Sequence, residues 1–478
     1  MKRNRSARTL PPTENDDWLQ PKYRGEFTVR DFNAFNTMKK GFDFSQAVAE
    51  ADRCLLCHDA PCSKGCPADT KPGEFIRKLQ LKNITGAIRT IKTNNILGGA
   101  CGVLCPTERL CEEACSAMLK SKEMPQGQDR AIRIGEIQRF LVEYSWERGY
   151  QVLKKPEQNR GKVAVVGSGP GGLSCAAELA QAGYLVTIFE ARPEPGGVIR
   201  YGVAPFRFDE NFLKKELADI EALGVEFVCN HRIEGEKGAE KLLENGFGAV
   251  FIAPGLWKAG ELKPGQAPIE GLLSSVDYLE SLRDGRLEQT AATFEGKTVA
   301  VIGGGAVAMD CADTAARIGA KDVYVVYRRS YLQMPAEEEE LQSALETGIH
   351  FLLLNQPLDY LTTADNKISG MKIVRTRLGE TDDSGRRTPV EIAGSEWNLD
   401  VDIVIEAIGN QAEPESPNWY PGVKTDGKHL IQADPETGET TVKGIFAGGD
   451  IVRGPSLVVN AVRDGKVAAQ AIQQYLNQ

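Results

Sequence analysis

Residues 162–172 read Lys-Val-Ala-Val-Val-Gly-Ser-Gly-Pro-Gly-Gly, a short apolar run that enters a glycine-rich turn. An Ala- and Leu-rich segment with helical spacing follows the turn. This order of strand, turn and helix is the setting in which a Gly-x-Gly-x-x-Gly motif binds a dinucleotide. Gly167 permits the tight turn, Gly169 lets the backbone approach a pyrophosphate, and Gly172 allows the helix to pack closely on the strand. The sequence therefore predicts an α/β unit whose helix N-terminus receives phosphates.

The next apolar run, residues 184–189, is followed directly by Glu190. An acid at this position of a dinucleotide-binding unit accepts hydrogen bonds from the ribose hydroxyls. A glycine-rich turn alone is weak support, because such turns are common. Strand, glycines, helix, strand and acid in this order are far more specific. They predict a dinucleotide with free ribose hydroxyls.

The same pattern returns later in the chain, where residues 298–302 lead into Gly-Gly-Gly-Ala-Val-Ala at 303–308. Ala308 replaces the third glycine, which the motif permits. The following strand, residues 322–327, ends in Arg328 and Arg329 rather than in an acid. Guanidinium groups suit a 2′-phosphate through charge-assisted hydrogen bonds. NADP(H) is therefore favoured, with NAD(H) as the alternative if the arginines merely follow a strand on a solvated edge.

A third glycine-rich strand end lies near the C-terminus, where residues 444–450 read Gly-Ile-Phe-Ala-Gly-Gly-Asp. Asp450 is placed to accept hydrogen bonds from a polyol, and the helix that opens near Val458 would direct its positive end at a flavin ring. Alone, Asp450 would be an ordinary turn acid. The glycine-rich turn at 303–308 already supplies the phosphate site of the second unit, so the strand that ends in Asp450 is not needed there. It is therefore expected to pair with the first sheet. The second dinucleotide unit would then be an insertion.

Eight of the 11 cysteines fall between Cys54 and Cys115, in two runs that each contain a Cys-Pro pair. Disulfides would need an oxidising compartment. Zinc normally draws on histidine as well, and His58 is the one histidine near these runs. Iron–sulfur clusters use dense cysteine runs that often close in Cys-Pro, so they are favoured over the other two, with two [4Fe–4S] centres as the natural count. The remaining Cys175, Cys229 and Cys311 are expected to be small buried hydrophobic residues.

Composition excludes several classes of protein. The 478 residues hold 57 Lys and Arg against 66 Asp and Glu, a net charge of −9 that argues against a nucleic-acid binder. The chain is 41% hydrophobic and 26% charged, as in soluble globular proteins. It has no run of about 18 apolar residues, so no membrane span is expected. Its basic start lacks an apolar stretch, which favours a cytoplasmic protein over a secreted one.

Seven motifs together resemble those of one known group of enzymes. They are CLLCHDAPCSKGCP (54–67), NNILGGACGVLCPTERLC (94–111), IGEIQRF (134–140), GSGPGGLSCA (167–176), GGGAVAMDCADTA (303–315), YRRSYLQMPA (327–336) and AGGDIVRG (447–454). From about residue 50 to its end, the chain resembles the small subunit of bacterial glutamate synthase. It is also similar to the N-terminal half of dihydropyrimidine dehydrogenase, including the separate bacterial small subunit of that enzyme.

The resemblance implies two cluster ligand sets. One would consist of Cys54, Cys57, Cys62 and Cys115, and the other of Cys66, Cys105, Cys111 and the side-chain oxygen of Gln138. Cys101 would then be spare. Glutamate synthase small subunits tend to carry glutamate at the position of Gln138, so this residue and the CLLCHDAPC run favour the dihydropyrimidine dehydrogenase group.

The resemblance also implies nucleotide-binding residues. FAD contacts would fall on Gly167, Ser168, Gly169, Gly172, Glu190, Gly197, Val198, Arg207, Gly449, Asp450 and Val458. NADP(H) contacts would fall on Gly305, Ala306, Val307, Ala308, Arg328, Arg329 and Gly409. Where the pyrimidine enzymes carry a further basic residue in the 2′-phosphate site, this chain carries Pro335.

The expected fold is an α-helical iron–sulfur domain followed by α/β, with two Rossmann-like domains and the NADP domain inserted in the FAD domain. The expected boundaries are an extended arm at 1–50, the cluster domain at 51–155, the FAD domain at 161–289 and 406–478, and the NAD(P)H domain at 290–405.

The expected function is electron transfer by an enzyme subunit. A hydride would pass between NADP(H) and FAD, and single electrons would pass through the clusters to or from a partner. No catalytic side chain is needed for hydride transfer. The terminal substrate is expected on another chain, a larger catalytic or electron-accepting subunit, with ferredoxin as a further candidate. A glutamate synthase small subunit, or the NADP(H)-side subunit of an electron-bifurcating complex with ferredoxin, is the alternative. Intact glycines, Glu190 and Asp450 speak against a cluster-bearing scaffold without activity.

Overall fold

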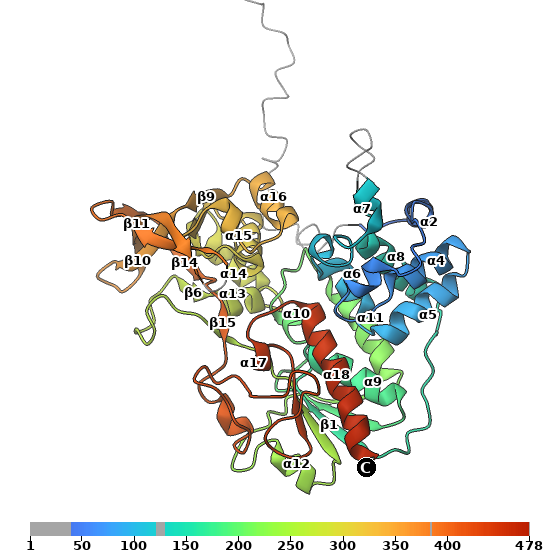
Figure 1. Cartoon of the computed structure of the whole chain (residues 1–478). Helices are drawn as coiled ribbons and strands as arrows, with labels where there is room; N and C mark the ends of the chain where they lie inside the picture. Colours follow the sequence, from blue (N-terminus) through green and yellow to red (C-terminus); the bar gives the residue numbers. More distant parts are fainter. Residues whose placement is uncertain (1–39, 121–129, 383–384, 478) are drawn as a thin grey trace, which may run out of the picture.

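The computed structural model describes residues 40–120, 130–382 and 385–477. They form a helical unit and two α/β units, which Figure 1 shows arranged around a common centre. Most of the arm expected at 1–50 lies outside the described residues. Its last part is helical rather than extended, because Asp43 and Gln46 form a capping box that starts helix α2.

The N-terminal unit consists of short helices, with the cysteine runs in and between them. They are α2 (Phe44–Asp52), α3 (Pro61–Lys64), α4 (Pro72–Gln80), α5 (Ile84–Asn94), α6 (Gly98–Leu104), the 3-10 helix η1 (Thr107–Arg109), α7 (Ser116–Lys120) and α8 (Ile134–Glu147). Phe75, Ile88 and Ile137 are fully buried at the centre of their core. This unit therefore folds around apolar helix faces, with most of its cysteines in the connections and Cys62 and Cys101 within α3 and α6.

The first α/β unit is a parallel sheet in the order β16-β4-β1-β2-β3. Its strands are β1 (Lys162–Val166), β2 (Leu185–Phe189), β3 (Glu226–Val228), β4 (Ala249–Ile252) and β16 (Ile445–Ala447). Its helices are α9 (Pro170–Gln181), α10 (Val198–Tyr201), α11 (Glu210–Glu221), α12 (Glu240–Glu244), α17 (Asp450–Arg453) and α18 (Val458–Leu476). Because β16 pairs with β4, the C-terminal strand returns to the first sheet, and the predicted insertion is confirmed.

The inserted unit has a second parallel sheet, in the order β6-β14-β7-β8-β9. Its strands are β6 (Leu272–Ser274), β7 (Thr298–Ile302), β8 (Asp322–Tyr327), β9 (His350–Leu353) and β14 (Ile403–Glu406), and its helices are α13 (Ser275–Ser281), α14 (Leu287–Phe294), α15 (Ala306–Arg317) and α16 (Glu338–Glu346). The sequence places the start of this unit at 290, but β6 and α13 already belong to it. A three-residue strand without a motif gives no sequence signal for that earlier start.

Antiparallel strands extend this second unit. They are β10 (Asn355–Thr362), β11 (Ile368–Thr381), β12 (Arg387–Glu391) and β13 (Trp397–Leu399). A separate pair, β5 (Lys258–Ala259) with β15 (Asn410–Gln411), joins the two chain segments that cross between the α/β units. The remaining 3-10 helices are η3 (Tyr331–Gln333) and η4 (Ser416–Trp419).

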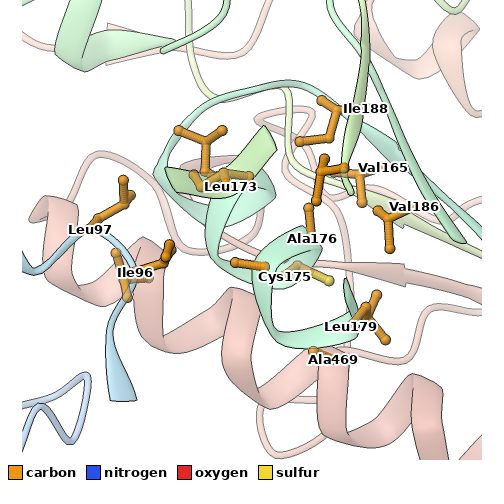
Figure 2. Packing of buried hydrophobic residues seen from close by; sticks show 14 of the residues in the cluster. Ile96, Leu97, Val165, Leu173, Cys175, Ala176, Leu179, Val186, Ile188 and Ala469 are labelled. Carbon is orange, nitrogen blue, oxygen red and sulfur yellow. The ribbon is translucent and has the colours of Figure 1, made fainter. Parts of the chain in front are cut away.

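One hydrophobic core joins the helical unit to the first α/β unit. Figure 2 shows Leu173 and Cys175 of α9 between sheet residues such as Val165, Ile96 of the helical unit and Ala469 of α18. Cys175 and Cys311 are fully buried, as expected, whereas Cys229 is half-buried. Shared burial of this kind fixes the cluster unit against the nucleotide-binding unit. Among the described helices, none is both long and apolar enough to span a bilayer.

Candidate nucleotide and cluster sites

A cavity of about 330 Å³ lies where the three units meet. The turn after β1 and the ends of β2 and β16 form its main wall, Ala306 and Val307 of α15 contribute from the second unit, and Leu104 and Pro106 from the helical unit. Its size suits a ligand site, for which about 300–1,000 Å³ is usual. A ligand in this cavity would touch all three units.

The glycines of the first motif are required by the close packing of the backbone at this wall. A Cβ added at Gly167 would lie 2.4 Å from the carbonyl oxygen of Ala253, and one added at Gly172 would lie 1.9 Å from the carbonyl oxygen of Gly167. Gly167 also has a φ of +97°, which favours glycine. Gly169 caps α9 and borders open space. The turn thus brings the N-terminus of α9 to the cavity, the position that suits a pyrophosphate.

Glu190 holds this turn in shape from the end of β2. One of its carboxylate oxygens accepts hydrogen bonds from the Ser168 N–H (2.9 Å) and hydroxyl (2.5 Å), and the other accepts from the Arg192 N–H (2.8 Å). The side chain is buried yet lines the cavity. Gly197, with a φ of +54°, packs against Gly169, where a Cβ would lie 2.5 Å from the Gly169 Cα. An acid here is positioned for ribose hydroxyls.

Asp450 lies on the same wall, directly after β16. Burial raises the pKa of this carboxyl to about 7, an effect that the nearby Arg453 and a hydrogen bond from the Ser456 backbone N–H oppose. Gly449 before it has a φ of +75° and donates its N–H to Asp464 (2.9 Å). Val198 and Val458 line the same cavity. The donor and acceptor chemistry of this wall fits a polyol that supplies the missing hydrogen bonds to Asp450.

The second unit presents the start of α15 to the cavity. Gly305 caps this helix and Ala306 and Val307 line the cavity, whereas Ala308 is fully buried in the core. Gly409, with a φ of +106°, borders open space. Of the four expected residues Gly305 to Ala308, Ala306 and Val307 line the cavity. Ala308 points inward because helix residues that face the sheet form the core.

Arg328 and Arg329 take different roles, because neighbouring side chains of a strand point to opposite faces. Arg329 is buried: its guanidinium donates to Asp382 (2.8 Å) and to the Arg387 carbonyl oxygen (2.8 Å). Arg328 is exposed, and its own carbonyl oxygen accepts from the Thr376 hydroxyl (2.8 Å). The exposed guanidinium of Arg328 is therefore the one that can meet a ligand.

Arg207, the expected FAD contact, also forms ion pairs within the protein. It lines the cavity, but its guanidinium is shared between Asp310 (2.9 Å) of α15 and Glu340 (2.8 Å) of α16. Burial raises the pKa of Asp310 to about 6, although the adjacent arginine favours the charged form. Arg207 therefore joins the first unit to the second.

A second ion pair, Arg109 with Glu337, joins the helical unit to the same helix. Glu337 and Glu340 are the two residues of the capping box of α16, and both line the cavity. The start of α16 thus holds both neighbouring units. Sequence reasoning did not identify these contacts, since a capping box is visible in a sequence but its partners in other units are not.

Four cysteines form an outer group: Cys54, Cys57, Cys62 and Cys115 line one small cavity of about 20 Å³, together with Leu55 and Leu56. These are the four that the sequence assigned to one cluster. Burial raises the pKa of the Cys62 thiol to about 11, and the neighbouring thiols of Cys115 and Cys54 add to the shift. Each of the eleven cysteines, all within the described residues, is a free thiol. Within the described ranges, no three His, Cys, Asp or Glu side chains are placed to hold a single metal ion.

Three further cysteines form an inner group: Cys66, Cys105 and Cys111. A hydrogen bond with Cys101, burial and the nearby thiols of Cys111 and Cys66 all raise the pKa of Cys105. Burial raises the pKa of Cys111, to which Glu112, Cys66 and Cys62 add. The inner group is next to the large cavity, because Leu104 and Pro106 on either side of Cys105 line it. Both groups offer clustered thiols, the donor chemistry that iron–sulfur clusters use.

Gln138 of α8 is buried, and its amide nitrogen donates to the Gly98 carbonyl oxygen (2.5 Å). Gly98 begins α6, the helix that precedes Cys105. Gln138 therefore packs against the element that positions the inner group.

Two regions of the chain match known families. Residues 161–465 match the family described as pyridine nucleotide-disulphide oxidoreductase, and residues 31–150 match dihydropyrimidine dehydrogenase domain II, 4Fe-4S cluster. The chain belongs to the pyridine nucleotide-disulphide oxidoreductase family. This oxidoreductase carries an iron–sulfur domain of the 4Fe–4S type in front of its nucleotide-binding domains, which decides between the three explanations for the cysteines.

The oxidoreductase is similar over most of its length to curated proteins. The "NAD-dependent dihydropyrimidine dehydrogenase subunit PreT" of Salmonella typhimurium is 34% identical over 93% of this chain and 98% of that protein. The "Glutamate synthase [NADPH] small chain" of Halomonas elongata is 35% identical over 90% and 91%. Moorella thermoacetica "NADP(+)-dependent formate dehydrogenase subunit beta" is 37% identical over 88% and 60%. The resemblance drawn from the motifs is confirmed.

Among solved structures, FprA of Mycobacterium tuberculosis in complex with NADPH has a TM-score of 0.56 and 21% identity, over 66% of this chain and 85% of FprA. This likeness shows the fold. The family matches and the curated relatives establish an NAD(P)H-dependent flavin and iron–sulfur oxidoreductase that transfers electrons.

Asp450→Asn is expected to raise the unfolding temperature of the FAD-free oxidoreductase, and to do so more at pH 8 than at pH 5. The carboxyl ionises near pH 4 in the unfolded chain but only at about 7 when folded. As pH rises from 4 to 7 the unfolded state releases its proton first, so the free energy of unfolding falls, and an amide removes that loss. Thermal unfolding monitored by circular dichroism measures it.

The matched control is Asp434→Asn, because backbone N–H groups lower the pKa of this exposed carboxyl. It should give no gain at pH 8. Asp450→Asn should also weaken FAD binding, since the charged acceptor is lost. Equal gains at both pH values would contradict the role of burial.

Proposed function

We propose that this oxidoreductase is an electron-input subunit: it passes a hydride between NADP(H) and FAD, and single electrons through two [4Fe–4S] clusters to or from a partner on another chain. When bound, FAD exchanges a hydride with the nicotinamide and exchanges single electrons with the clusters. The observation that carries the proposal is the single cavity shared by all three units, one wall of which flanks Cys105.

The residues of the first unit would bind and orient FAD. The turn from Gly167 to Gly172 would receive the pyrophosphate on its N–H groups, Glu190 would accept from the ribose and Asp450 from the polyol. The start of α15 would receive the phosphates of the nicotinamide nucleotide, and Arg328 its 2′-phosphate. These groups hold the two rings together and exclude water, and hydride transfer requires no acid or base from the chain.

The outer group, Cys54, Cys57, Cys62 and Cys115, would hold one cluster. The inner group, Cys66, Cys105 and Cys111, would hold the other with Gln138. The hydrogen bond from the Gln138 amide nitrogen to Gly98 supports this, because it leaves the carbonyl oxygen as the atom for a metal. Such thiolates require reducing conditions, as in the cytoplasm.

The partner would be a larger subunit. The relatives are named as a subunit, a small chain and a subunit beta, which supports a heteromeric complex. Glutamine at position 138 favours a partner of the dihydropyrimidine dehydrogenase type. The 35% identity to a glutamate synthase small chain makes that assembly the second candidate. Purification of the native complex and identification of the co-purifying chain would distinguish them.

The purified chain, handled without oxygen, is expected to carry one FAD and about eight irons, since each of two clusters has four. Flavin absorbance and iron analysis measure this. Cys229→Ser is the matched control, because Cys229 belongs to neither group and should leave the iron content unchanged. A colourless protein, or zinc as its main metal, would contradict the proposal.

A further inference from the structure

A buried amide lies between two thiols of the inner group. Asn95 follows α5 and is 1% exposed. Its carbonyl oxygen accepts from the Leu97 N–H (3.0 Å), which fixes the orientation of the amide. Its nitrogen donates to the Thr70 hydroxyl (3.2 Å) and to the Cys101 sulfur (3.3 Å). Both hydrogens of the Asn95 amide are therefore donated to Thr70 and Cys101, which are neighbours of the inner group.

These two acceptors in turn contact the thiols that the proposed function assigns to one cluster. The Thr70 N–H donates to the Cys66 sulfur (3.5 Å), and the Thr70 hydroxyl lies 3.4 Å from the same sulfur. Cys101 accepts a hydrogen bond from the Cys105 thiol, so the two sulfurs are direct neighbours. Since Asn95 donates to both Thr70 and Cys101, each of them must direct its own hydrogen elsewhere. The available acceptors are the sulfurs of Cys66 and Cys105 once these are thiolates.

We propose that Asn95 is a positioning residue that aims the Thr70 hydroxyl and the Cys101 thiol at Cys66 and Cys105, and so raises the reduction potential of the inner cluster. The inference rests on the proposed function. Hydrogen bonds to ligand sulfurs favour the reduced cluster, because reduction adds negative charge to the thiolates. It also gives the spare Cys101 a role as a donor rather than a ligand.

The bridge is anchored from the nucleotide side. Lys466 of α18 donates to the carbonyl oxygen of Ala68 (2.6 Å) and to that of Asn94. Ala68 lies between Cys66 and Thr70, and Asn94 precedes Asn95. The ammonium group of Lys466 therefore holds both chain segments that carry the Asn95 hydrogen bond to Thr70. The first turn of α18 lines the large cavity at Val458 and Ala461. The helix that lines the cavity with its first turn therefore also holds the bridge through Lys466.

The test is a redox titration of the anaerobic holoenzyme followed by EPR. In Asn95→Ala, one cluster should show a lower potential, with about a tenfold fall in its reduced-to-oxidised ratio at a fixed potential, or about 59 mV for a one-electron couple. The other cluster should be unchanged. Asn94→Ala is the matched control, because the Asn94 side chain donates to the Thr90 carbonyl oxygen (2.7 Å), outside the bridge.

Thr70→Val and Cys101→Ala each remove one branch of the bridge and should give smaller shifts of the same signal. Gln138→Cys identifies that signal as the inner cluster, since it changes a ligand of that cluster alone. Unchanged potentials in Asn95→Ala with full iron would overturn the inference. If Asn95→Ala loses iron, the nearly isosteric Thr70→Val decides. A wild-type protein with fewer than two clusters would instead refute the proposed function, and the bridge with it.

Discussion

Cys105→Ala is expected to remove about four irons and to reduce electron delivery to a one-electron partner by on the order of a hundredfold or more, while FAD stays bound. Leu104 and Pro106 place Cys105 at the wall of the large cavity, whereas none of the outer group's cysteines lines that cavity. Electrons that enter at the cavity would then lack the inner cluster, which is their first acceptor on the way to the partner. NADPH oxidation with a two-electron dye should continue, because the nucleotide-binding residues are intact.

The matched control lies one helical turn earlier. Cys101→Ala removes a thiol that is buried in α6 and lies outside the proposed ligand set. It should keep the full iron content and change electron delivery far less. Iron analysis, the flavin spectrum and the two acceptor assays separate the variants. Iron loss in Cys101→Ala, with retention in Cys105→Ala, would exchange the roles of the two cysteines.

The fold could be predicted because its local signals are strong. The strand, glycine turn and helix at 162–181 need glycine where backbone atoms meet, as the 2.4 Å and 1.9 Å approaches at Gly167 and Gly172 show. The strand that ends in Asp450 had no place in the second dinucleotide unit, so its return to the first sheet could be predicted, and β16 does pair with β4. The four cysteines of the outer group were likewise grouped by resemblance, and the structure gathers them around one cavity.

The contacts between units could not be predicted. Arg207 pairs with Asp310 and Glu340, and Arg109 with Glu337, across segments far apart in sequence. Whether Arg328 or Arg329 can meet a ligand depends on the side of the chain to which each side chain points. Asp382, more than fifty residues later and next to the antiparallel strands, binds Arg329 and so holds it on the buried side. Tertiary partners of this kind leave no periodic or local signal.

Arg328→Ser is expected to reduce the NADPH-to-NADH preference about tenfold to a hundredfold while FAD remains bound. A charge-assisted hydrogen bond to a phosphate contributes about 1.5–3 kcal/mol, and 1.4 kcal/mol corresponds to tenfold. The Arg328 side chain is exposed at the end of β8, and the Thr376 hydroxyl fixes its backbone. The ratio of kcat/KM for NADPH and NADH with an artificial acceptor measures the preference.

Arg329→Ser is the matched control, because the same substitution one residue later removes a guanidinium already bonded to Asp382 and to the Arg387 carbonyl oxygen. It should lower the unfolding temperature, since it removes two hydrogen bonds of a buried guanidinium, and should leave the nucleotide preference unchanged. Pro335 makes the prediction demanding, because the resemblance implies a further basic residue at this position of the 2′-phosphate site and this chain has none there. A wild-type enzyme that prefers NADH would contradict the assignment of NADP(H). Loss of preference in Arg329→Ser but not in Arg328→Ser would mean that the ion pair with Asp382 opens when the nucleotide binds.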